Sequence, residues 1–190
     1  MGIRSGKGDK GYTDLFFRHR ISKDSHDIRV IGDLDELNCN IGLVRSKIRK
    51  REHKAVLEKI QKALLLIGSE IAVGAEKKEK LGPLLKGEEV RWIRKALDEL
   101  EREANPGKCF VIPGETELSA YLDMARAVAR RAERSVVGLF RKEKASDEYV
   151  VSYLNCISDV LFVMARCYDK GVKRPGKKKV SGRSRKAGRK

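Results

Sequence analysis

Apolar residues recur with the period of an α-helix along most of the chain. Between residues 33 and 48 they form one stripe, made of Leu34, Leu37, Ile41, Val44 and Ile48. Similar stripes cover residues 53–75, 88–104, 117–141 and 147–168. The pattern therefore predicts an all-α fold, a five-helix up-and-down bundle with few strands.

Polar residues mark where these helices start. Asp33, with Glu36 three residues later, resembles a capping box and predicts the start of the first helix. Thr116 and Ser146 are the expected caps of the fourth and fifth helices. The first thirty residues are rich in glycine and charge. They are predicted to form a loop with a short extended piece at residues 15–17.

Positive charge is concentrated at the carboxyl end. Residues 170–190 carry eleven Lys and Arg and no acid, so only 5 of the 16 net positive charges belong to residues 1–169. We therefore expect one folded domain over 1–169, with 1–30 as its loop region, and a disordered basic tail over 170–190. The tail is either a solubilising extension or a weak, non-specific contact for nucleic acid or another anionic surface.

The cysteines and histidines give no metal-binding pattern. Four cysteines occur without a C-x-x-C pair, and three of them lie in apolar, helix-like runs. His19, His26 and His53 have no ligand spacing to each other or to the cysteines. With no signal peptide, and no apolar run near the roughly 18–20 residues of a membrane span, we expect reduced thiols in a cytoplasmic protein without a membrane segment.

The amino-terminal stretch SGKGDKGYT, residues 5–13, is the first candidate site. Its glycines allow backbone N–H groups to converge on an anion, and Lys7 and Lys10 add positive charge. The Walker A spacing is coincidental, because Tyr12 stands in place of the lysine and no buried strand precedes the loop. By itself the stretch is either a phosphate cradle or a flexible leader.

The fourth helix carries a second candidate. Arg126, Arg130 and Glu133 share one face among small apolar residues, whereas Arg131 and Arg134 point elsewhere. This face is either solvated or drawn into a cleft where arginine binds an oxyanion.

Two further helices carry polar pairs within apolar stripes. Asn155 and Asp159 lie four residues apart on the fifth helix, and Asp35 and Asn38 lie three residues apart on the first. These pairs either bond neighbouring helices or bind a ligand.

Five blocks, in order, resemble the PduO-type ATP:cob(I)alamin adenosyltransferases. They are GDKGYT at 8–13, RVIGDLDELNCNIG at 29–42, FVIPG at 110–114, ARAVARRAER at 125–134 and YLNCISDVLFVMAR at 153–166. The resemblance implies a homotrimer that binds ATP and a corrinoid at subunit interfaces. It also implies transfer of the 5′-deoxyadenosyl group of ATP to cob(I)alamin, with Mg²⁺ carried by the ATP phosphates and no separate protein metal site.

The resemblance assigns roles to single residues. The implied triphosphate cradle contains Gly8, Asp9, Lys10, Gly11 and Thr13, with Lys23 reaching the same phosphates. Arg130 and Glu133 are similar to the family's ATP-contacting pair, and Asn155 to its nucleotide-binding asparagine.

The same resemblance places the corrin side of the site. Arg126 and Asp35 resemble a salt bridge between subunits, and Phe110 resembles the phenylalanine below the corrin ring. The chain departs from the family pattern at Glu115, where glycine is usual, and at Asp123, where histidine is common.

Two alternative functions remain at this point. One is a basic helical nucleic-acid-binding protein, and the other is a non-catalytic carrier of adenosylcobalamin. A cobalamin reductase and an adenosylcobalamin-dependent acceptor enzyme are the further partners that the resemblance suggests.

Overall fold

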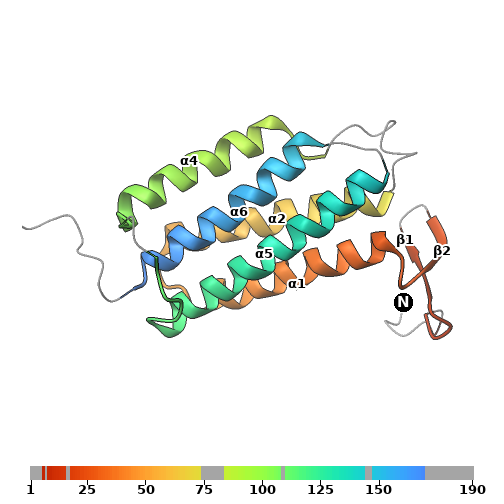
Figure 1. Ribbon diagram of the computed structural model, residues 1–190, viewed down its shortest axis with the longest axis horizontal. Coiled ribbons are helices and arrows are strands. Elements are labelled where there is room, and N and C mark those ends of the chain that lie inside the picture. The colour runs from red at the N-terminus through yellow and green to blue at the C-terminus, as the bar shows by residue number, and fades with distance from the viewer. Residues whose placement is uncertain are drawn as a thin grey trace, which may run out of the picture.

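The computed structural model describes residues 6, 8–15, 18–73, 84–107, 110–143 and 147–169. Strands β1 (Tyr12–Leu15) and β2 (Arg18–Ser22) form an antiparallel hairpin. The helices are α1 (His26–Lys47), α2 (Arg51–Val73), α4 (Gly87–Ala104), α5 (Glu117–Lys142) and α6 (Glu148–Arg166). Figure 1 shows these helices side by side along the long axis, with the hairpin at one end. The predicted all-α bundle is thus confirmed.

The core lies between the predicted apolar stripes. Helix α1 packs against α2 and α5, and α6 packs against α4 and α5. Leu37 and Ile41 of α1, like Ile157 and Leu161 of α6, are fully buried. Burying apolar area at about 25 cal/mol per Å² is the main contribution that holds such a bundle together.

Helix α6 is apolar enough to resemble a membrane span by length and composition. However, 61% of its most apolar window is buried inside the bundle. A core helix covered by two neighbours has this composition for packing reasons alone.

The start of α1 differs from the prediction. The helix begins at His26, and the Ser25 side chain caps it by accepting a 3.4 Å hydrogen bond from the Ile28 N–H. Asp33 lies within the helix and accepts a hydrogen bond from Ser135 of α5. The capping-box interpretation of Asp33 and Glu36 was therefore wrong, because both carboxylates face α5.

Of the two other predicted helix caps, one is confirmed and one is wrong. Thr116 caps α5 as predicted, accepting a 3.0 Å hydrogen bond from the Ser119 N–H. The cap of α6 is Asp147, which accepts from the N–H groups of Tyr149 and Val150 at 3.1 Å each, and not Ser146. A carboxylate satisfies two of the free N–H groups at a helix start and complements its dipole.

The amino-terminal region is more ordered than the predicted loop. Strands β1 and β2 pair as a hairpin, and α1 begins at residue 26. Residues 16–17 of the predicted extended piece lie outside the described residues. Lys47 near the end of α1 contacts Glu117 at the start of α5, at 2.8 Å. The hairpin and the segment that joins α4 to α5 therefore lie at opposite ends of the bundle.

Candidate active site

The amino-terminal loop folds back on itself before β1. The Gly11 N–H donates to the Gly8 carbonyl at 3.2 Å, and the Lys23 N–H donates to the Gly11 carbonyl at 2.9 Å. Gly11 has a φ of 79°, which favours glycine. A side chain on Gly8 would place its Cβ 2.9 Å from the Lys23 ammonium. The structure thus brings Gly8, Gly11 and Lys23 together, as the sequence suggested.

The remaining loop residues surround this turn. Asp9 and Lys10 are exposed, and Thr13 is half-buried on β1. Lys7 and Ser5 lie outside the described residues. The Lys23 ammonium beside the glycine backbone is a suitable environment for an anion.

A groove of about 470 Å³ lies between the carboxyl half of α5 and the amino half of α6. Glu133 and Asn155 line it from the two helices, and Val137, Phe140 and Val151 contribute apolar walls. An apolar groove with a few polar groups is the usual form of a small-molecule site. Tertiary packing therefore joins two predicted site residues that lie far apart in the sequence.

Arg130 lies one helical turn before Glu133 and is exposed. Partial burial raises the pKa of Asp159 on α6, and the Arg130 charge opposes that shift. Arg130 therefore influences the same α5–α6 surface that carries Asn155.

Arg126 and Asp35 do not meet within one chain. The Arg126 Nε atom lies 3.6 Å from Asp123 on its own helix. Asp35 is exposed and, with Asn38, lines a second groove of about 620 Å³ between α1 and α2. A pair between Arg126 and Asp35 would require a second subunit.

Asp123 is buried in a network that sequence reasoning missed. Its carboxylate accepts a 2.6 Å hydrogen bond from Arg166 of α6, whose Nε lies 2.7 Å from Asp169. The spacing along α5 could have predicted that Asp123 is buried. It lies four residues after Ser119, on the same face of the helix, and Ser119 faces the core. Asp123 is therefore a structural carboxylate that joins α5 to α6.

Arg131 is directed away from the candidate site, as expected. It forms an ion pair with Glu36 and lies 3.8 Å from Asp33, both on α1. Arg131 therefore links α5 to two acidic residues of α1.

Phe110 and Ile112 extend into solvent at the opposite end of the bundle from the hairpin. Phe110 is fully exposed and Ile112 is 89% exposed. Glu115, which lies nearby in the sequence, is also exposed. Exposed apolar side chains so close together are typical of a surface that binds a partner or ligand.

The cysteines only partly match the expectation of core thiols. Cys156 is buried and Cys167 is half-buried, but Cys39 is exposed on α1. Cys109 and the tail residues 170–190 lie outside the described residues. The α1 stripe faces inward at Leu37 and Ile41, so Cys39 between them points outward.

Comparison with known proteins identifies the family. The cobalamin adenosyltransferase family profile matches residues 3–168. The corrinoid adenosyltransferase PduO of Salmonella typhimurium is 32% identical over 169 residues, covering 89% of this chain and 50% of that protein. A corrinoid adenosyltransferase of Citrobacter freundii is 35% identical over 164 residues, covering 86% of this chain and 93% of the relative.

A solved structure shows the same fold. It is a variant of the PduO-type ATP:corrinoid adenosyltransferase from Lactobacillus reuteri, complexed with cobalamin and ATP. It superimposes with a TM-score of 0.79 at 30% identity, covering 87% of this chain and 92% of that chain.

These likenesses define a helical corrinoid adenosyltransferase fold. The chain belongs to the cobalamin adenosyltransferase family. It spans about half the length of the PduO proteins of Salmonella typhimurium and Citrobacter freundii.

Proposed function

We propose that this protein transfers the 5′-deoxyadenosyl group of ATP to the cobalt of cob(I)alamin, releasing triphosphate. The α5–α6 groove carries the proposal, because it brings together Glu133 and Asn155, the two residues that the sequence resemblance assigns to nucleotide binding. Its apolar walls suit the adenine ring, and its polar groups suit the ribose hydroxyls. Arg130, one turn away, would contact the phosphates.

The loop around Gly8 and Lys23 would hold the triphosphate. The Lys23 ammonium lies directly against Gly8, so backbone and positive charge are available together. Asp9 and Thr13 add oxygen donors of the kind that Mg²⁺ prefers, and Mg²⁺ would arrive with ATP and neutralise phosphate charge.

The reaction requires positioning more than a protein nucleophile. The electron pair of Co(I) attacks the 5′-carbon of ATP, the new Co–C bond forms, and the C–O bond to triphosphate breaks. Lys23 and Arg130 would stabilise the negative charge that develops on the leaving group. Neither a catalytic serine nor a catalytic histidine is needed for this chemistry.

Phe110 would act on the corrin side of the site. Its complete exposure supports this role, since an apolar side chain in water is available to occupy the lower face of the ring. Displacing the lower axial ligand makes Co(II) easier to reduce to the reactive Co(I) state.

We infer a homotrimer from the same family membership. The α1 residue Asp35 is exposed, and Arg126 pairs with Asp123 in its own chain and leaves its Nε without a hydrogen bond. A neighbouring subunit could therefore join Asp35 to Arg126 and close the corrin side. A cytoplasmic location, a cobalamin reductase and an adenosylcobalamin-dependent acceptor enzyme complete the proposal.

A spectroscopic assay tests the activity. The protein is incubated with ATP, Mg²⁺ and chemically reduced cobalamin, and adenosylcobalamin formation is followed by absorbance. Repeated turnover supports the proposal, and a single equivalent retained on the protein would indicate a carrier. No conversion by protein that still binds ATP would contradict it.

A further inference from the structure

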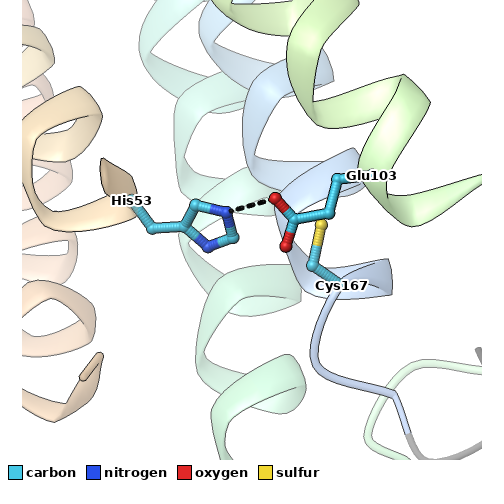
Figure 2. Close-up of side chains that lie close together, drawn as sticks. All are labelled: His53, Glu103 and Cys167. Atoms are coloured by element: carbon cyan, nitrogen blue, oxygen red, sulfur yellow. Dashed lines mark hydrogen bonds and ion pairs between the residues drawn. The ribbon is translucent and has the colours of Figure 1, made fainter. Parts of the chain in front are cut away.

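Three side chains with metal-binding atoms meet at the end of the bundle opposite the hairpin. His53 lies in the first turn of α2, Glu103 lies in the last turn of α4, and Cys167 directly follows α6. Figure 2 shows their side chains directed toward one another from three separate elements. The ligating nitrogen, oxygen and sulfur atoms all lie within 4.8 Å of one another.

We propose that His53, Glu103 and Cys167 bind a divalent transition-metal ion, with Zn²⁺ as the best-fitting ion. Imidazole, thiolate and carboxylate are the three ligand types that zinc uses, and a water molecule would complete the tetrahedron. Two ligands on a tetrahedral zinc lie about 3.5 Å apart. The His53 Nε2 and Glu103 Oε2 atoms are already at 3.2 Å.

His53 has the orientation of a metal ligand. Its Nδ1 atom shares a 2.8 Å hydrogen bond with the Tyr168 hydroxyl, which leaves Nε2 directed at Glu103. A partner on the second ring nitrogen is what fixes the ring of a metal-binding histidine.

The charges of the cluster balance when a metal binds. The Cys167 sulfur binds a metal as the thiolate, so its thiol proton must leave when the ion binds. A bound cation displaces that proton to solvent as the metal–sulfur bond forms. One thiolate and one carboxylate then neutralise the two positive charges.

Lys50 competes with the metal for the same carboxylate. Its ammonium group forms an ion pair with Glu103 through the oxygen that also faces His53. Glu103 is 40% exposed, so the cluster opens to solvent on this side. Metal binding would replace the Lys50 contact, and Lys50 can turn into water.

A metal bound here would link the start of α2 to the ends of α4 and α6, beside the segment that leads to Phe110. The Tyr168 carbonyl also accepts a 3.1 Å hydrogen bond from Thr116 at the start of α5. The cluster thus connects α2, α4 and α6 directly, and α5 through Tyr168. It does not include any residue of the proposed ATP groove, so the two proposals succeed or fail independently.

Titration of the full chain with Co²⁺, without ATP or corrinoid, tests the site. Cobalt replaces zinc in tetrahedral sites, and bonding to a thiolate produces a charge-transfer absorption band. We expect one equivalent to bind with this band, and added Zn²⁺ to remove it. The Cys167→Ser variant should lack the band, whereas the Cys39→Ser control should retain it.

Two more variants separate a metal site from a structural hydrogen-bond network. Tyr168→Phe should raise the apparent Kd for Co²⁺ by about tenfold to a hundredfold, because His53 loses its orienting partner. Lys50→Met should lower that Kd, since Glu103 becomes free. The proposal is overturned if wild type shows no thiolate band, if Cys167→Ser keeps it, or if Lys50→Met weakens binding.

Discussion

The Asp123 carboxylate accepts a 2.6 Å hydrogen bond from Arg166 inside the bundle, where both side chains are only 5% exposed. The same carboxylate lies 3.6 Å from Arg126, and Arg166 also contacts Asp169. This network links α5 to the end of α6 and holds Arg126, a residue of the proposed corrin side. Asp123 therefore supports both packing and the position of a site residue.

Replacing Asp123 with alanine should destabilise the protein strongly. The change leaves Arg166 buried with only part of its charge compensated, and breaking such pairs costs about 3–5 kcal/mol. Urea unfolding of Asp123→Ala measures the loss. The control is Lys47→Gln, which breaks the exposed Lys47–Glu117 pair and should change stability little. If both substitutions lower the free energy of unfolding equally, the buried network stabilises the protein no more than an exposed ion pair does.

Arg130→Ala should reduce adenosyl transfer at least about a hundredfold while the protein remains folded, because charge on departing triphosphate loses its partner. Steady-state kinetics gives the turnover rate, and circular dichroism monitors the helices. Arg134→Ala removes another exposed arginine of α5 and should leave turnover nearly unchanged. Near-normal activity of Arg130→Ala would exclude the proposed phosphate contact.

Gly8→Ala should weaken ATP binding without loss of the fold. The new Cβ would lie 2.9 Å from the Lys23 Nζ atom and 3.3 Å from its Cε atom, so Lys23 must move away. Isothermal titration with Mg²⁺ and ATP measures the change. Gly138→Ala is the matched control, because a Cβ there meets nothing within 4 Å on helix α5. Unchanged ATP affinity in Gly8→Ala would argue against a triphosphate cradle at this loop.

Cys156 should resist alkylation in the folded protein. Burial raises the pKa of its thiol, although Arg94 opposes the shift, so the reactive thiolate forms only at higher pH than usual. Cys39 is exposed to the reagent and should react faster than Cys156. Peptide mass spectrometry after iodoacetamide treatment at several pH values compares the two. Equal rates in the folded state would contradict the effect of burial, and unfolding should abolish the difference.

Deleting residues 170–190 should leave adenosyl transfer largely unchanged, because the basic tail lies outside the five sequence blocks that carry the resemblance. The same kinetic assay tests this with the truncated chain. A large loss of turnover would mean that the tail forms part of the site.

The amino-acid sequence by itself determined the helical bundle and most of its core. Stripes such as Leu37 with Ile41 identified the buried faces, because helical periodicity reflects burial directly. Thr116 marked the start of α5, since its capping partner Ser119 lies only three residues away. The ordered blocks likewise indicated the family and its candidate residues.

Tertiary structure decided the contacts between distant elements. Asp33 looks like a helix cap in sequence, but Ser135 of α5 binds it. Similarly, no local spacing connects His53, Glu103 and Cys167. They approach only because the start of α2 and the ends of α4 and α6 lie together. Local patterns encode which face of a helix is buried, whereas polar partners across the bundle depend on how the helices pack.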